Sequence, residues 1–200
     1  MYNGKEPRKL STRTLVILAM FSALATVLMF LDFPLSFLFP GFLRFDFSDL
    51  PVLMASFWFG PLAGIAVALV KNLIHLTVTQ TFGVGELANF IVSAVLAGTA
   101  GLVYRIRKTK GGAVAGLVCG GLAMALAGFL ANYFILIPFY SNVMGWPLQT
   151  IIDMCAQLIP AIKTKFDVVL LGITPFNLFK AALIGGLTFL LYKRVRGLLK

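Results

Sequence analysis

The sequence predicts an all-α integral membrane protein of six transmembrane helices, with the N- and C-termini both cytoplasmic. Of its 200 residues, 60% are hydrophobic and only 12% are charged, and the mean hydropathy is +0.95. A soluble domain carries about 25% charged residues, so this composition excludes a large soluble domain. The apolar residues form runs that approach the roughly 20 residues a helix needs to cross a bilayer. We therefore expect a single membrane domain over 1–200.

The predicted helices follow the apolar runs in chain order. They cover residues 14–31, 51–70, 72–82, 86–104, 112–140 and 173–192. The run 72–82 is short and comes directly after Lys71 and Asn72. We count it as a helix because both ends of the chain and the turn 105–111 are basic, and the positive-inside rule places basic connections in the cytoplasm. The long connections 32–50 and 141–172 then face outward.

The positive charge is explained by this topology. The net charge is +10, and the basic residues gather in three clusters that flank apolar runs. The clusters are Lys5, Arg8, Lys9, Arg13; Arg105, Arg107, Lys108, Lys110; and Lys193, Arg194, Arg196, Lys200. We expect contact with membrane lipid and no nucleic-acid partner. The two cysteines fit no metal-ligand or redox spacing, so no metal site is expected.

Five polar side chains are predicted to lie at one depth. Glu86 and Asn89 open the fourth helix, Asn132 lies in the outer part of the fifth, and Asn177 and Lys180 lie in the outer part of the sixth. All five fall roughly one to two turns below the outer surface. An ionisable group within a membrane helix costs several kcal/mol unless it is paired or solvated. The shared depth favours an outward-opening pocket that binds a ligand with polar and flat parts.

Each of these residues also has a simpler interpretation. Lys180 could extend along the helix to the interface. Asn89 and Asn132 could join helices by hydrogen bonds, and Glu86 is a favourable acid in the first turn of a helix. The residues alone leave these alternatives open.

The loop before the second helix is the second candidate for the site. In the stretch 42–51, Phe45 and Phe47 alternate with polar residues, and Arg44, Asp46 and Asp49 can pair locally. The stretch Leu43–Phe47 is predicted to form a wall or lid over the pocket. The alternative is an ordinary capped loop at the interface.

Small residues on the first helix suggest a helix–helix contact. Ala19 and Ala23 are four residues apart, a spacing that lets another helix approach closely. The pattern is common in membrane helices and is weak evidence by itself.

Enzymatic motifs are missing from the chain. The sequence contains no H-E-x-x-H, no G-x-S-x-G and no phosphate-binding glycine loop. We therefore predict that it is not an enzyme, has no catalytic cofactor and encodes no ATPase of its own. If the protein drives uphill transport, the energy must come from another subunit or from an ion gradient.

The chain resembles the S-components of energy-coupling-factor (ECF) vitamin transporters, and in particular the riboflavin-specific members. The motifs that carry this resemblance are Phe-Leu-Arg-Phe-Asp-Phe-Ser-Asp-Leu-Pro at 42–51, Phe-Gly-Pro-Leu-Ala-Gly at 59–64, Lys-Asn-Leu-Ile-His at 71–75, Gly-Glu-Leu-Ala-Asn-Phe at 85–90, Ala-Asn-Tyr at 131–133 and Pro-Phe-Asn-Leu-Phe-Lys at 175–180. Together they span nearly the whole chain. Arg44 stands where a lysine is expected in that family, a change that keeps the charge.

The resemblance implies a substrate-binding subunit in a prokaryotic cell membrane. Its partners would be riboflavin, a transmembrane coupling subunit and two ATPases. Asn132, Asn177 and Lys180 would contact the ribityl chain or the isoalloxazine edge, and Ala19 and Ala23 would contact the coupling subunit. Glu86, Asn89, Leu43, Phe45 and Phe47 are further candidates for the ligand site.

Three other functions remain open from the residues. The same fold could bind a different vitamin. The chain could be an intramembrane enzyme that uses Asp46, Asp49 or Glu86, or a channel or scaffold in which the polar residues only join helices.

Overall fold

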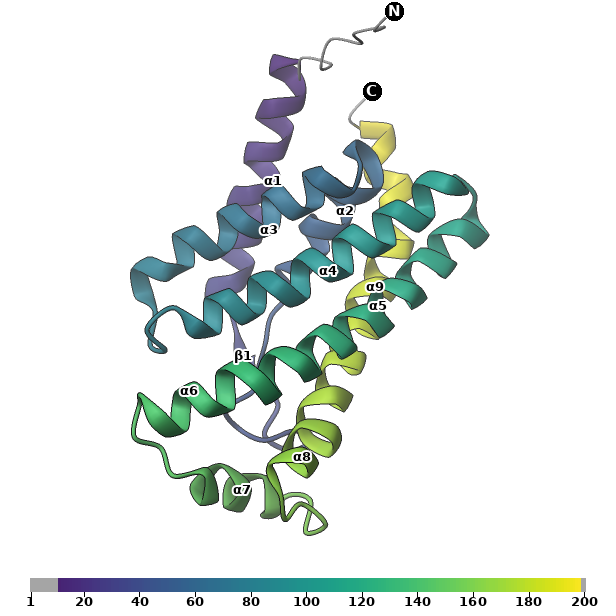
Figure 1. Cartoon of the computed structure of the whole chain (residues 1–200). Helices are drawn as coiled ribbons and strands as arrows, with labels where there is room; N and C mark the ends of the chain where they lie inside the picture. Colours follow the sequence, from purple (N-terminus) through teal and green to yellow (C-terminus); the bar gives the residue numbers. More distant parts are fainter. Residues whose placement is uncertain (1–10, 199–200) are drawn as a thin grey trace, which may run out of the picture.

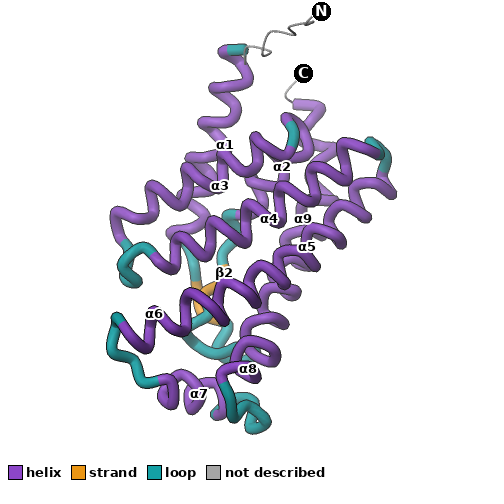
Figure 2. The backbone as a smooth tube through the Cα atoms, viewed as in Figure 1, coloured by secondary structure: helices purple, strands orange, loops and turns teal. Residues whose placement is uncertain are grey.

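A computed structural model describes residues 11–198 of the chain, with side chains through Tyr192. The chain is mostly helical, with one short two-stranded ladder (Figures 1 and 2). In order, the elements are α1 (Thr12–Phe30), β1 (Phe33–Pro34), β2 (Arg44–Phe45), α2 (Asp49–Phe59), α3 (Pro61–His75), η1 (Leu76–Val78), α4 (Val84–Ile106), α5 (Lys110–Ala131), η2 (Asn132–Leu136), α6 (Ile137–Asn142), α7 (Leu148–Ala156), α8 (Lys165–Asp167), η3 (Val168–Ile173) and α9 (Thr174–Leu198).

Five helical stretches within residues 11–198 are long and apolar enough to cross a membrane. They are Thr12–Phe30, Pro61–Val78, Val84–Ile106, Lys110–Asn142 and Lys165–Tyr192. The predicted multi-pass helical protein is therefore confirmed. The helix α2 has only 11 residues, too few to cross alone, so six full crossings stay a prediction.

The break between the second and third helices differs from the sequence prediction. We predicted one helix over 51–70 and a short one over 72–82, but the chain turns at Gly60. Gly60 has a φ of 104°, which an L side chain rarely adopts, and Pro61 suits the first position of α3. Lys71 and Asn72 lie inside α3. The Lys71 side chain donates to Asp49 of α2, and the Asn72 side chain donates to the backbone oxygen of Ala68.

The two ends of the molecule differ in structure (Figure 1). The beginning of α1 and the end of α9 lie at one end, here called the terminal end. The short helices α6, α7 and α8 lie at the opposite end, here called the loop end. The helices α7 and α8 both fall within the predicted connection 141–172, which is thus partly helical.

The loop after α1 folds back on itself as a β-ladder. Phe33 pairs with Phe45 and Pro34 with Arg44 in antiparallel register. This ladder adds a small β element to the predicted all-α fold. It fixes which side chains of residues 42–47 face the helices.

Two π-helical segments interrupt the long helices near the loop end. The segment η2 begins at Asn132, and η3 ends just before Thr174. Each is closely followed by a proline, Pro138 or Pro175, whose missing N–H interrupts the regular helical hydrogen bonding. Single π-helical turns of this kind occur often at functional sites.

Glycines bring α4 and α5 into close contact. A Cβ added at Gly116 would lie 2.7 Å from the backbone oxygen of Ala100, and one at Gly120 would lie 2.8 Å from that of Leu96. The two backbones therefore approach more closely than larger residues would allow. This contact supports the α4 residues that line the site.

Candidate ligand-binding site

Four buried charged side chains meet between the loop and three helices, and we call them the charge network. Lys180 Nζ lies 2.7 Å from Asp46 Oδ2 and 3.3 Å from Asp49 Oδ2. Lys71 Nζ lies 2.7 Å from Asp49 Oδ1 and donates to Ser48 Oγ at 2.6 Å. Lys71 is 0% exposed and Lys180 is 3% exposed. Two carboxylates thus balance two ammonium groups away from water.

The network joins four parts of the chain. Asp46 follows β2, Asp49 opens α2, Lys71 belongs to α3 and Lys180 to α9. Ser93 of α4 adds a fifth contact by donating to Asp49 Oδ1. The ends of these elements are therefore positioned with respect to one another by charge as well as by apolar packing.

The charge of Asp46 is stabilised by its partners. Burial by itself would raise the pKa of Asp46, but the Lys180 and Lys71 charges outweigh burial and hold that pKa below its ordinary value. The backbone N–H of Ser48 also donates to Asp46 Oδ1 at 2.8 Å. Asp46 is therefore a carboxylate at neutral pH.

The network decides one alternative and corrects one predicted pairing. Lys180 does not extend to the interface but turns inward to Asp46 and Asp49. Arg44 pairs with Asp32 rather than with Asp46 or Asp49, through Nη2 to Oδ1 at 2.8 Å and Nε to Oδ2 at 2.5 Å. Both Asp32 and Arg44 belong to the loop between α1 and α2.

A polar cavity of about 440 Å³ opens beside the network, at the ends of α1, α3 and α4 that meet the loop. Its volume lies within the range of about 300–1,000 Å³ that is usual for small-molecule sites. The polar residues around it are Asp32, Arg44, Asp46, His75, Gln80, Thr81, Glu86 and Asn89. Two of the predicted site residues, Glu86 and Asn89, therefore share one cavity.

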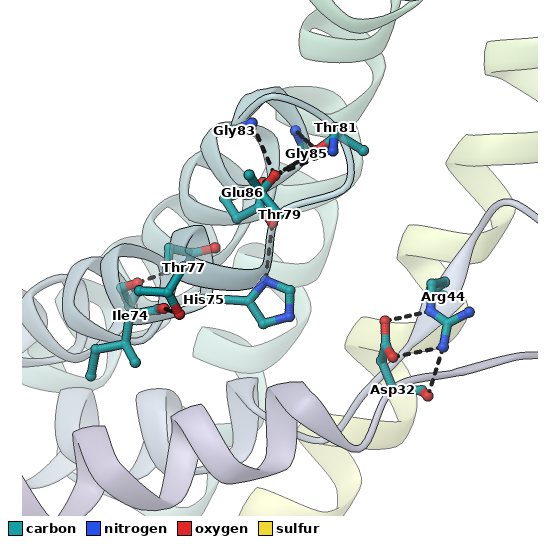
Figure 3. A network of polar contacts seen from close by, with 12 residues as sticks. Asp32, Arg44, Ile74, His75, Thr77, Thr79, Thr81, Gly83, Gly85 and Glu86 are labelled. Carbon is teal, nitrogen blue, oxygen red and sulfur yellow. Dashed lines mark hydrogen bonds and ion pairs between the residues drawn. The ribbon is translucent and has the colours of Figure 1, made fainter.

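Glu86 is held in place by the turn between α3 and α4 (Figure 3). Its carboxylate accepts hydrogen bonds from Thr79 Oγ1 at 2.8 Å and from Thr81 Oγ1 at 3.2 Å. His75 Nδ1 lies 3.0 Å from Glu86 Oε1, and the His75 ring stacks on Phe30. Figure 3 also shows the Asp32–Arg44 pair on the loop, and both clusters line the same cavity. Glu86 is thus engaged by its own turn and forms one wall.

The loop presents alternate side chains to the cavity. Phe42, Arg44 and Asp46 line it, whereas Phe45 is buried and packs on Phe179. Side chains alternate in this way along a strand. Leu43, Phe45 and Phe47 therefore pack into the core instead of forming the wall of this cavity, and a ligand-binding role for them stays a prediction.

The predicted asparagines on α9 and η2, Asn177 and Asn132, do not line this cavity. The Asn177 side chain is buried, and within residues 11–198 its amide has no hydrogen-bond partner. A Cβ at Gly128 would lie only 2.3 Å from Asn177 Nδ2. Asn132 Nδ2 donates to Gly128 O at 2.8 Å. Asn132 and Asn177 are therefore brought together around Gly128, one helical turn from Lys180.

The structure thus divides the predicted pocket into two parts. Glu86 and Asn89 line the cavity, Asn132 and Asn177 lie around Gly128, and Asp46 contacts both the cavity and Lys180. Sequence reasoning missed Lys71, Ser93 and His75 as members of the site. If the third span had been predicted to begin after Gly60, Lys71 would have been placed inside a membrane helix. An ionisable group there is costly unless it is paired or solvated, so Lys71 would have been a candidate for the site, as Lys180 was.

Comparison with known proteins gives consistent matches. The family described as "ECF transporter, substrate-specific component" matches residues 13–192. The chain is 36% identical to the riboflavin transporter RibU of Staphylococcus aureus, over 99% of this chain and 98% of the relative. It is also 36% identical to the riboflavin transporter FmnP of Bacillus subtilis, over 88% and 87% of the two chains.

A solved structure matches the fold. It is described as the S component of a bacterial ECF transporter, and it shares 35% identity and a TM-score of 0.74 with this chain. The match covers 94% of this chain and 98% of the other.

Removal of Lys71 should destabilise the protein strongly. Lys71→Met leaves the Asp49 carboxylate buried with one counter-charge fewer, and breaking a buried pair costs about 3–5 kcal/mol. The matched control is Arg44→Met, because Arg44 is 53% exposed in its ion pair and an exposed pair contributes about 0–1 kcal/mol. Thermal unfolding in detergent measures both. Equal unfolding midpoints for the two variants would refute the stabilising role of the network.

Proposed function

Since the chain belongs to the ECF transporter family of substrate-specific components, we propose that it is the riboflavin-binding membrane subunit of an ECF-type vitamin importer. Two relatives with this specificity match it over nearly their full length. Proteins of this family bind a substrate for transport, and this accords with the lack of enzymatic motifs. Riboflavin is therefore cargo here and has no catalytic role.

The observation that supports a flavin site best is the unpartnered Asn177 amide. The Asn177 residue is 6% exposed, and a ligand can supply hydrogen-bond partners for both the donors and the acceptor of its amide. The flavin ring carries adjacent carbonyl and N–H groups, and an asparagine both donates and accepts. Asn132, which donates to Gly128 O, and Lys180, one helical turn from Asn177, are the further polar contacts in this proposal. Phe42 of the loop, which lines the cavity, offers apolar surface.

We orient the protein with the loop end outward. The basic turn 105–111 then lies in the cytoplasm with both termini, as the positive-inside rule requires. The acidic residues near the cavity lie on the opposite side. The cavity would take up vitamin from outside a prokaryotic cell membrane.

We propose that Asp46 occupies the place of a ligand group in the empty protein. Its carboxylate lines the cavity and also lies 2.7 Å from Lys180 Nζ. An incoming ligand oxygen would replace it on Lys180. Asp49 would remain 3.3 Å from the ammonium, so that Lys180 would keep a counter-ion during the exchange.

The position of Asp46 suits this exchange. Asp46 belongs to the loop, and the Arg44–Asp32 pair lies entirely within the same loop, so the loop can move without breaking it. The Asp46–Lys180 pair instead ties the loop to α9. Ligand binding would thus change the ion pair that fixes the loop over the site.

The proposed partners are a transmembrane coupling subunit and two ATPases, which would supply the energy. On α1, Ala19 and Ala23 are exposed, whereas Phe21, Ala25 and Met29 are buried. The small residues are therefore available to a partner helix. We assign the coupling contact to this face.

A change of the Asn177 amide should weaken flavin binding. Asn177→Ala leaves the polar edge of the ligand without partners, at a cost of about 1–3 kcal/mol, or about 5- to 150-fold in Kd. Titration of the purified protein, followed by visible absorption of the flavin, measures this. Asn142→Ala, an exposed asparagine on α6, is the control. Unchanged affinity in Asn177→Ala would refute the site.

The second candidate function is transport of a different vitamin. A thermal-shift screen tests it, because a vitamin that stabilises the protein more than riboflavin does would be the better candidate for the cargo.

Removal of the Asp46 charge should tighten flavin binding. Asp46→Asn removes the group that competes for Lys180, and a hydrogen bond to a charged group contributes at least about 1.5 kcal/mol. We expect about a tenfold lower Kd. Asp153→Asn, an exposed acid on α7, should leave Kd unchanged. Weaker binding in Asp46→Asn would instead make Asp46 a ligand contact or a structural requirement.

Bulky residues on the exposed edge of α1 should abolish transport and spare binding. Ala19→Trp and Ala23→Trp block close approach of a partner helix. Vitamin uptake by cells and flavin binding by the purified protein are measured side by side. Leu24→Trp, on another exposed part of α1, is the control. Lost binding in the alanine variants would indicate a packing role.

A further inference from the structure

A second polar cavity lies at the terminal end, far along the helices from the vitamin site. It has a volume of about 360 Å³ and is formed by the end of α2, the beginning of α3 and the end of α4. Its residues include Ser56, Trp58, Gly60, Tyr104, Arg105 and Lys108. None of the proposed vitamin contacts belongs to it.

A glycine allows the helices beside this cavity to approach each other. A Cβ at Gly101 would lie 2.1 Å from Ser56 Oγ and 3.1 Å from Pro61 Cα, so α4 approaches the α2–α3 turn closely. Trp58 Nε1 donates to the backbone oxygen of Tyr192 at 3.1 Å, which ties the turn to α9. The cavity is therefore enclosed by three helices that are held in a fixed arrangement.

Tyr104 presents a polar group without a partner to this cavity. Tyr104 is 7% exposed, and its ring contacts Phe57 and Tyr192. Its hydroxyl makes no hydrogen bond with any part of the chain that the structure describes. Since Tyr104 lines the cavity, its hydroxyl is available to donate a hydrogen bond to a group bound there.

The positive charge of the cavity favours an anionic ligand group. Arg105 and Lys108 line the cavity, and none of the other lining residues that the structure describes is acidic. Within residues 11–198 neither cation forms an ion pair. Two cations and a hydroxyl donor suit a phosphate oxygen, which accepts hydrogen bonds and carries negative charge.

The position of the cavity at the ends of the membrane-spanning helices indicates that the phosphate belongs to a lipid. Gly60 and Tyr104 lie where membrane-spanning stretches begin and end, and Trp58 is of the type enriched at the membrane interface. The exposed apolar side chains of Leu62 and Ile106 continue along α3 and α4, where acyl chains would run. We propose that this cavity binds the headgroup phosphate of an anionic phospholipid of the cytoplasmic leaflet.

The test measures phosphatidylglycerol bound to the purified full-length protein in detergent, by native mass spectrometry and by thermal shift. Arg105→Gln combined with Lys108→Gln should weaken lipid binding about 30-fold, since each basic residue contributes about five- to sixfold. Tyr104→Phe should weaken it about three- to tenfold by loss of one hydrogen bond. Riboflavin affinity should stay unchanged in all variants, which shows that each is folded.

The matched control removes two charges from the same basic turn outside the cavity. Arg107 and Lys110 are exposed and do not line it. Arg107→Gln combined with Lys110→Gln should change lipid binding by less than about threefold, because such charges are screened by salt. An equal loss of lipid binding in both double variants would mean that only the overall positive charge of the turn matters, and this would overturn the site. Equally tight binding of free glycerol phosphate would overturn the assignment to lipid.

Discussion

The charge network is the interaction on which the rest of the structure depends. Asp46, Asp49, Lys71 and Lys180 come from four segments and are buried together. A buried charge is tolerated only when its partners are in place, so in the empty protein the network holds the loop, α2, α3 and α9 in one arrangement. Asp46 belongs both to this network and to the lining of the polar cavity, whereas Asn132 and Asn177 do not line that cavity.

Much of the fold follows from the sequence because bilayer thickness sets helix length. The apolar runs 14–31 and 86–104 lie within two residues of α1 and α4 at each end, and the run 112–140 corresponds to α5, η2 and α6 together. The α2–α3 turn was misplaced because Lys71 was taken as the marker of a helix end. A lysine that is paired with a buried acid, as Lys71 is with Asp49, can lie inside a helix and does not mark its end. The Gly60–Pro61 pair is the better signal of the turn. The β-ladder and the π-helical segments depend on tertiary contacts that the pattern of residues does not show.

Some residues of the candidate site can be recognised from the sequence because the bilayer also penalises polar side chains. Polar residues in apolar helices are costly, so Asn132, Asn177 and Lys180 stood out from their neighbours. The sequence could not show which acid pairs with Lys180, because Asp46 is 134 residues away along the chain. The side of the loop that faces the cavity was also hidden, since it depends on the register of β1 with β2. Burial and partner identity are properties of the folded chain.

The most direct test is a double-mutant cycle between Asp46 and Lys180, measured with and without riboflavin. Asp46→Asn, Lys180→Met and the double variant give the coupling free energy of the pair from their unfolding midpoints. The account predicts strong coupling, of about 3 kcal/mol, in the empty protein. It predicts coupling near zero when riboflavin is saturating, because the ligand has then replaced Asp46. Equal coupling in the empty and the saturated protein would contradict the exchange.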